Sequence, residues 1–238
     1  MSTDTPTIFF MLLLAIDTSG KHGGIVLARA GERSGASDDV VIIEIAPIFG
    51  GTFSAHLVPQ IAALLSSHSL SKKDIGAFVV AAGPGSFTGL RIGLAAVKAL
   101  AEILEKPIAA VSLLEASVFS SALEGKIMAA LDAGRGDVYV GEYEVPGKPD
   151  QVPREYLLSR SEFLVQAVGW MVVTSDSAIA EAAQAAGLAV SAMKPLSAAE
   201  FARLGWIKIQ SGEIVTGESL QANYIRRTDA EILEKSGS

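Results

Sequence analysis

Cysteine is absent from this sequence of 238 residues, and histidine occurs only three times. A chain without cysteine forms no disulfide, thiolate nucleophile or zinc–sulfur site. Its histidines, His22, His56 and His68, make no i, i+3 or i, i+4 pair and no His-Glu-x-x-His motif, which are the spacings that place two metal ligands on one helical face. We therefore expect no metal site. The lack of cysteine also fits a reducing compartment, so we expect a cytoplasmic protein.

Positive charge and long apolar runs are also scarce. Nineteen lysines and arginines face 26 acidic residues, for a formal net charge of −7. Because nucleic-acid binding depends on clustered basic side chains, we expect contact with a polynucleotide only through a more basic partner. The longest apolar run, Ile8 to Ile16, is too short to span a bilayer. We expect no membrane association, and we interpret residues 1–10 as a loose leader.

The most informative segment that is present is the glycine-rich stretch 83–93, GPGSFTGLRIG. It joins an apolar, strand-like run to a helix-like one, so its backbone N–H groups suit an anion or a closely packed partner. Thr88 stands where a dinucleotide fingerprint, or a P-loop starting at Gly83, needs glycine. A nucleophile elbow around Ser86 would need glycine at Pro84 and Thr88. A tight turn with helix capping by Ser86 or Thr88 remains the structural alternative.

The hydrophobic pattern predicts the order β-β-β-α-β-α-β for the first half of the chain. The strands are expected at 12–17, 24–29, 40–46, 77–82 and 108–111, separated by a polar turn at 30–39 and by helices at 54–67 and 90–104. The second half is expected to contain a helix at 113–123, strands at 127–132 and 138–144, a loop at 146–156, a strand at 165–174 and helices at 178–187 and 198–211. Ser197 and Glu200 predict a capping box for the last helix.

Two of these strands end in aspartate, Asp17 and Asp132, before a short turn and a returning strand. We interpret this similarity as an internal duplication. Two such hairpins facing one cleft resemble the phosphate and metal-ion arrangement of the actin-like ATPases. The predicted nucleotide-binding residues are Asp17, Thr18, Ser19, Gly83, Gly85 and Asp132.

Four segments together resemble the TsaB (also called YeaZ) family: Ala15–Ser19, Gly83–Gly93, Asp132–Tyr139 and Asn223–Arg227. Ala222 and Ile225 depart from the family's Pro-x-Tyr-Leu-Arg signature. The resemblance implies an α/β fold of the actin-like/Hsp70-like (ASKHA) class with two related subdomains, each a mixed β-sheet with helices. We expect the first at 1–111, joined by the tail 214–238, and the smaller second at 112–213.

The same resemblance implies a role in forming N6-threonylcarbamoyladenosine at position 37 of tRNA. In that pathway TsaB is the non-catalytic partner of TsaD, TsaE is an ATPase and TsaC supplies threonylcarbamoyl-adenylate. TsaD carries a His-x-x-x-His pair where this chain has Leu113 and Ser117, and leucine cannot bind a metal. No cofactor is then required, although weak ATP or ADP binding stays open. The alternative is a metal- or nucleotide-dependent enzyme acting alone, either a TsaD-like transferase or an M22-type peptidase.

The helix at 90–104 is apolar nearly all round, with polar side chains only at Arg91, Lys98 and Glu102. It is either a central helix of one domain or, with the helix at 54–67, a surface for a second helix pair. The predicted interface residues are His56, Leu57, Ile61, Leu64, Gly89, Gly93, Ala96, Ala99 and Leu100. The resemblance implies that this surface forms a heterodimer with TsaD or, without TsaD, a homodimer. TsaE and tRNA would be reached only through the complex.

Overall fold

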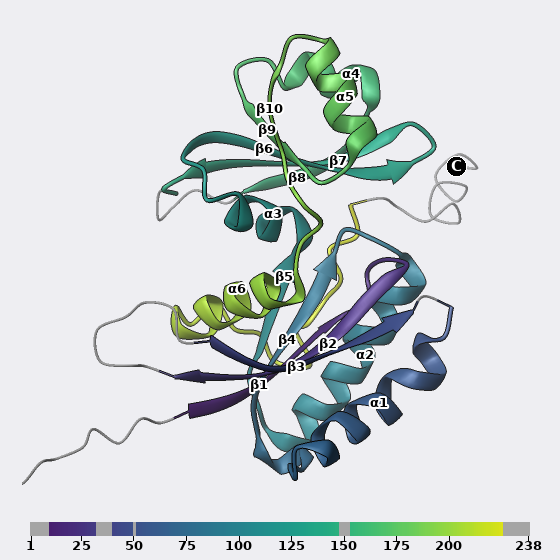
Figure 1. Cartoon of the computed structure of the whole chain (residues 1–238), viewed down its shortest axis with the longest axis vertical. Helices are drawn as coiled ribbons and strands as arrows, with labels where there is room; N and C mark the ends of the chain where they lie inside the picture. The colour runs from purple at the N-terminus through teal and green to yellow at the C-terminus, as the bar shows by residue number, and fades with distance from the viewer. Residues whose placement is uncertain (1–9, 32–39, 50, 148–152, 226–238) are drawn as a thin grey trace, which may run out of the picture. The chain divides into compact units, whose positions relative to one another are not determined.

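A computed structural model of the chain describes residues 10–31, 40–49, 51–147 and 153–225 (Figure 1). Its elements run through one order twice: three strands, then helix, strand, helix, strand and helix. The first pass comprises β1 (Phe10–Asp17), β2 (His22–Gly31), β3 (Val40–Phe49), α1 (Phe53–Ser67), β4 (Ile75–Gly83), α2 (Phe87–Leu104), β5 (Ile108–Ser112) and α3 (Leu113–Ser121), with a 3-10 turn η1 (Lys72–Asp74) before β4. The second comprises β6 (Gly125–Gly134), β7 (Asp137–Val145), β8 (Arg154–Ser159), α4 (Arg160–Gln166), β9 (Met171–Thr174), α5 (Ser177–Ala185), β10 (Ala189–Ala192) and α6 (Ala198–Gln210).

The two passes build two five-stranded sheets with the same topology. The first sheet has the order β3-β2-β1-β4-β5, and the second, read in the matching direction, has the order β8-β7-β6-β9-β10. In each, the first three strands are antiparallel, and the central strand pairs in parallel with the next one, β1 with β4 and β6 with β9. The element order predicted for the first half and the internal duplication are therefore confirmed, as is the α/β class.

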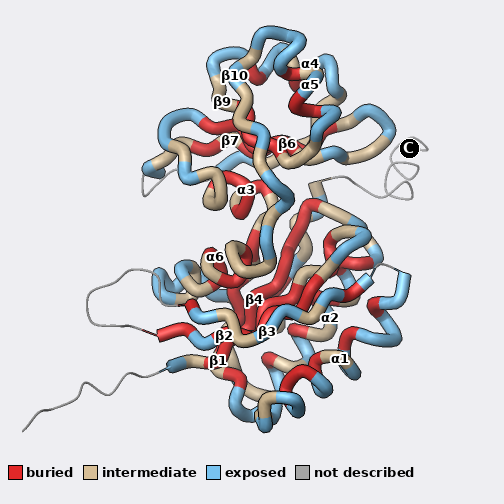
Figure 2. Tube along the Cα trace, viewed as in Figure 1, coloured by how far each residue is buried: buried red, intermediate tan, exposed pale blue. Residues whose placement is uncertain are grey.

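Helices cover both faces of the first sheet, as two adjacent glycines of β2 show. A side chain at Gly23 would meet Phe53 of α1, and one at Gly24 would approach Ala198 of α6. Because successive residues of a strand point to opposite faces, α1 and α6 lie on opposite sides of the sheet. α2 packs beside α1. The core between these layers contains fully buried side chains from β1, β2 and β4 (Figure 2).

The second sheet is covered in the same way. On one face, Met128 and Ala130 of β6 pack with Phe163 of α4 and Ile179 of α5. On the other, Ile127 and Ala129 pack with side chains of α3. This alternation along β6 follows from the two-residue period of a strand. The apolar run of β6 is buried on both faces, as expected for a central strand.

The last helix of each pass covers the sheet of the other pass. α3 follows β5 but packs on β6, β7 and β9, and α6 follows β10 but packs on β1, β2 and β3. The two compact units are accordingly 1–82, 86–111 and 197–222 in the first, and 83–85, 112–196 and 223–238 in the second. This division differs from the expected boundary, which placed α6 in the second subdomain and the whole tail in the first. The local cause is Gly205, which lets α6 lie against Val79 of β4.

Two predictions for the second half need correction. Residues 154–156, expected in a loop, are the first part of β8, which pairs with β7. The strand expected at 165–174 is in fact the end of α4, a turn and the short β9. β10 was not predicted. The cause of the second error is that the apolar residues Val165 and Val168 are exposed and do not belong to the buried run that starts at Met171.

Other local predictions are confirmed. The Ser86 hydroxyl caps α2 by accepting a hydrogen bond from the Gly89 amide at 3.3 Å, and Ser197 with Glu200 forms the capping box of α6. The predicted leader, most of the turn at 30–39 and the arginines of the tail motif fall outside the described residues. No helix among the described residues is long and apolar enough to cross a membrane.

Candidate functional site

The β1–β2 turn holds the half-buried carboxyl group of Asp17. Asp17 accepts hydrogen bonds from the Ser19 amide at 2.8 Å and the Ser19 hydroxyl at 2.6 Å, which closes a turn typical of Asp. Burial raises the pKa of Asp17, and the two bonds from Ser19 only partly oppose this effect. Carboxyl groups whose pKa is raised by loss of solvent are common at functional sites.

The same turn is attached directly to the first turn of α2. The Thr18 hydroxyl donates to the Gly89 carbonyl at 2.7 Å, and the Ser86 amide donates to the Ser19 carbonyl at 2.6 Å. Three of the predicted nucleotide-binding residues, Asp17, Thr18 and Ser19, are therefore held together and next to the glycine-rich segment.

This contact explains two of the glycines in the motif. A β-carbon at Gly89 would lie 2.0 Å from the Thr18 carbonyl oxygen, and one at Gly93 would lie 2.4 Å from the Thr18 hydroxyl oxygen. Both distances are far inside van der Waals contact, so the two positions require glycine because of the neighbouring turn. Their small size therefore serves packing inside the first unit, and the expectation that these two glycines form a surface is wrong.

The corresponding turn of the second sheet has a different character. Asp132 is exposed and accepts a hydrogen bond from the Gly134 amide at 3.1 Å. The duplication thus preserves the aspartate but not its burial. Asp132, Gly83 and Gly85 belong to the second unit, whereas Asp17, Thr18 and Ser19 belong to the first. That all six residues share one nucleotide site stays a prediction.

The remaining predicted interface residues belong to α1 and α2, and the structure divides them between the core and the outer surface. Leu57, Ile61 and Leu64 are buried in the core of the first unit and cannot contact a partner directly, because α1 turns this stripe towards the sheet. His56 and Ala99 are exposed, and Ala96 and Leu100 are half-buried. That these four residues contact a partner stays a prediction.

The exposed surface of α1 and α2 includes a set of apolar side chains, while its charged residues, Arg91, Lys98 and Glu102, all belong to α2. α1 contains no Asp, Glu, Lys or Arg in 15 residues. Its Val58 is 58% exposed, and Ile103 of α2 is 70% exposed. Alanines at 55, 62, 63, 95 and 99 are also exposed and lie on the same two helices. Such a surface is typical of contact sites in proteins. We call these exposed side chains the α1–α2 surface.

A pocket of about 500 Å³ lies where α1 and α2 begin. Its polar groups are the Lys21 ammonium and the hydroxyls of Ser54, Ser86 and Thr88, and its apolar walls include Phe53 and Ile92. No acidic residue lines it among the described residues. The ammonium, the hydroxyls and two helix N termini make it chemically suited to an acidic group. The sequence prediction did not include Lys21 or Ser54.

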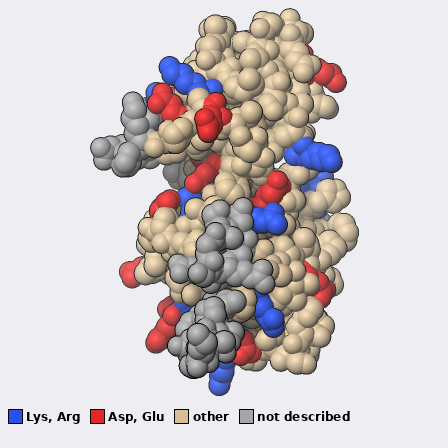
Figure 3. Space-filling model, turned by 60° about the vertical axis from the view of Figure 1, so that its left-hand side comes forward, with Lys and Arg blue, Asp and Glu red and all other residues tan. Residues whose placement is uncertain are grey.

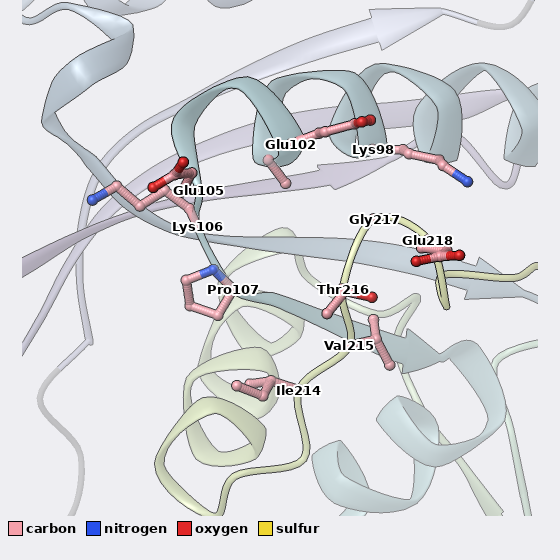
Figure 4. A pocket seen from close by; sticks show the side chains of 11 residues that line it. Lys98, Glu102, Glu105, Lys106, Pro107, Ile214, Val215, Thr216, Gly217 and Glu218 are labelled. Atoms are coloured by element: carbon pink, nitrogen blue, oxygen red, sulfur yellow. The ribbon is translucent and has the colours of Figure 1, made fainter.

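A second cavity, of about 690 Å³, lies between the end of α2 and the segment that follows α6 (Figure 4). Val215 of that segment forms an antiparallel bridge with Ile108, the first residue of β5. Lysines and glutamates both line the cavity, namely Lys98, Lys106, Glu102, Glu105 and Glu218. This mixture of charges defines no single ligand class. Sequence reasoning missed the cavity because its wall comes from a segment without regular structure.

The positions compared with the TsaD histidines are occupied by a packed part of α3. Ser117 is buried, and its hydroxyl donates to the Leu113 carbonyl at 2.8 Å. Among the described residues, no group of three or more His, Cys, Asp or Glu side chains could hold a metal ion. On the face shown in Figure 3, basic and acidic side chains of the described residues are interspersed, without a continuous basic patch.

The duplicated sheets, the aspartate-tipped turns and the exchanged helices define an α/β protein of the actin-like (ASKHA) class. The structure of YeaZ from Pseudomonas aeruginosa superposes with a TM-score of 0.65, covering 90% of this chain and 99% of that one at 24% identity. This similarity supports the fold.

Sequence comparison gives the family. The model described as TsaD, tRNA N6-adenosine threonylcarbamoyltransferase, matches residues 48–210. The tRNA threonylcarbamoyladenosine biosynthesis protein TsaB of Bacillus subtilis is 39% identical over 135 residues, 56% of this chain and 56% of that protein. TsaB of Escherichia coli is 31% identical over 137 residues, 56% and 55% of the two chains. The chain belongs to this family, and within it to the TsaB (YeaZ) proteins. It spans about half the length of the curated relatives it matches.

Proposed function

We propose that the chain is the non-catalytic partner of TsaD in the formation of N6-threonylcarbamoyladenosine in tRNA. The pathway follows from the family, because the relatives of this chain are named tRNA threonylcarbamoyladenosine biosynthesis proteins. In this proposal the protein works in the cytoplasm with TsaC and TsaE, and TsaE and tRNA contact it only through the complex.

The α1–α2 surface is the observation that carries the partner role. It consists of exposed alanine, valine and isoleucine side chains, and α1 has no Asp, Glu, Lys or Arg. Burying these side chains against a second pair of helices removes apolar area from water. TsaD is the partner we propose for this surface, and a second copy of the chain occupies it when TsaD is absent.

The absence of a catalytic role is supported by residue types in α3. The resemblance to TsaD aligns Leu113 and Ser117 with a metal-binding histidine pair. A leucine side chain offers no ligand atom, and the Ser117 hydroxyl is buried and already bonded to the Leu113 carbonyl. No required cofactor is part of the proposal. Weak binding of ATP or ADP near Asp17 is a separate prediction. Titration calorimetry of the isolated protein with each nucleotide tests it.

The substitution Ala99→Glu tests the interface. Ala99 is exposed in the unbound chain, so the variant should fold normally. In the complex its carboxylate would be buried without a partner, and we expect at least a tenfold loss of affinity for TsaD, on the order of 1.4 kcal/mol or more. Calorimetry or co-purification with TsaD measures the change, and circular dichroism checks the fold.

The matched control is Ala178→Glu, an exposed alanine in α5 of the second unit. It adds the same charge to a helix outside the α1–α2 surface and should leave TsaD binding unchanged. Equal affinity of the folded Ala99→Glu variant and wild type would contradict the proposed interface. A TsaD-independent transferase activity of the isolated chain would contradict the non-catalytic role.

A further inference from the structure

Glu155 of β8 accepts hydrogen bonds from three side chains that are far apart in the sequence. The Ser112 hydroxyl and the Tyr143 hydroxyl each donate to Oε1 at 2.5 Å, and the Asn223 side-chain amide donates to Oε2. Glu155 itself is half-buried. Hydrogen bonds to a carboxylate are about twice as strong as those between neutral groups, so these three bonds tie Glu155 firmly to its donors.

Two of the three donors stand where the chain passes into the second unit. Ser112, the last residue of β5, begins the segment 112–196 of that unit, and Asn223 is the first residue after the segment 197–222. We call Ser112 and Asn223 the linking residues, and both are bonded to one carboxylate. Tyr143 differs from them, because it lies within β7 and belongs to the second sheet throughout.

Each linking residue also organises the segment that follows it. The Ser112 hydroxyl accepts from the Leu114 amide at 3.2 Å and the Glu115 amide at 3.5 Å, so it caps α3 while it donates to Glu155. A hydroxyl that donates to an anion becomes a better acceptor, and negative charge favours a helix N terminus. The Asn223 carbonyl accepts from the Ile225 amide at 3.1 Å, and Ile225 packs on the core beneath α3.

Tyr143 keeps its proton in this cluster. Burial is the largest cause that raises its pKa, followed by the neighbouring charge of Glu155. The hydroxyl therefore remains a donor and fixes the carboxylate on the second sheet. Glu155 is itself a residue of β8, which pairs with β7, so its position on the sheet does not depend on the Tyr143 bond alone.

We propose that Glu155 is a clasp that fastens both linking residues to the second sheet, so that the start of α3 and the segment 223–225 are held or released together. The clasp is a conformational device of the fold and does not depend on the proposed function. It predicts that two segments more than 100 residues apart in sequence share one local opening reaction.

Hydrogen exchange read by mass spectrometry tests the clasp in the full-length protein. The variant Glu155→Ala should raise the exchange rates of peptides covering residues 112–118 and 220–225 together, each by about fivefold or more. Glu155→Gln keeps the shape and one acceptor but removes the charge, so it should produce a smaller rise in both peptides. This second variant carries the test if Glu155→Ala does not fold.

Tyr143→Phe is the matched control. It removes one hydrogen bond to the same carboxylate but leaves both linking residues bonded, so exchange in the two peptides should stay within about twofold of wild type. A rise in only one of the two peptides in the Glu155 variants, or in neither, would overturn the proposal. So would equal effects of Tyr143→Phe and Glu155→Gln.

Discussion

The contact between Gly205 of α6 and Val79 of β4 offers a direct test of how the first unit is packed. A β-carbon at position 205 would lie 2.3 Å and 2.4 Å from the two γ-carbons of Val79 and 2.9 Å from its β-carbon. Non-bonded carbons prefer separations of about 3.5–4.0 Å. The variant Gly205→Ala must therefore move α6 away from the sheet or force Val79 out of its position.

The expected magnitude combines two opposing effects. Inserting a methyl group into a packed core costs typically about 1–3 kcal/mol, and three short contacts place this site at or above the upper end. Replacing glycine by alanine in a helix interior contributes about 1 kcal/mol in the opposite direction. We expect a net loss of about 2 kcal/mol, which for a chain of this size lowers Tm by about 4–8 °C.

A double-mutant cycle measured by urea denaturation checks this contact. Val79→Ala alone should cost about 2 kcal/mol, because Val79 is fully buried and loses two methyl groups. In the double variant the new methyl group at 205 fills the space left at 79, so the combined loss should stay near that of either single variant. Additive losses, or a Gly205→Ala variant as stable as wild type, would refute the proposed packing.

Two further predictions concern the β1–β2 turn. Because burial raises the folded-state pKa of Asp17 above its unfolded value of 3.8, the folded protein loses stability as pH rises from 3.8 through the folded-state pKa. Asp17→Asn should therefore increase the free energy of unfolding at pH 7. This gain should shrink as pH falls through the folded-state pKa and should be absent below pH 3.8. Urea titrations at several pH values measure this, and a gain that grows towards low pH would contradict it. Gly93→Ala should cost about 1–3 kcal/mol, because its β-carbon would lie 2.4 Å from the Thr18 hydroxyl oxygen. Thr18→Ala should relieve part of that loss in the double variant, and no relief would show that Thr18 is not the obstacle.

Much of the first unit could be predicted because the pattern of apolar residues along its strands and helices is regular. The strand at β1 is a run of buried residues ending in Asp17, and α1 shows Leu57, Ile61 and Leu64 on one buried stripe. Such periodicity identifies elements without knowledge of their neighbours. The same stripe was misread as part of a partner surface, since periodicity identifies an apolar face but not what covers it.

The weaker predictions depended on distant contacts. The glycines at 89 and 93 resemble a helix–helix contact surface, yet their neighbour is Thr18, more than 70 residues earlier. β8 has no continuous apolar run and is recognised only through its pairing with β7. The exchange of α3 and α6 between the sheets leaves no local signal in the sequence, since each helix looks the same on either sheet. The pocket at Lys21 is likewise lined by residues from three separate parts of the sequence, at 20–21, 51–54 and 86–92, so no single segment predicts it.

Reconstitution of the tRNA modification tests the central claim most directly. Purified chain, TsaD and TsaE are combined with tRNA and threonylcarbamoyl-adenylate, and N6-threonylcarbamoyladenosine is measured with each protein omitted in turn. The account predicts that product formation requires TsaD, that adding this chain increases it, and that the Ala99→Glu variant does not. Product from this chain without TsaD, or full activity of TsaD without this chain, would contradict the account.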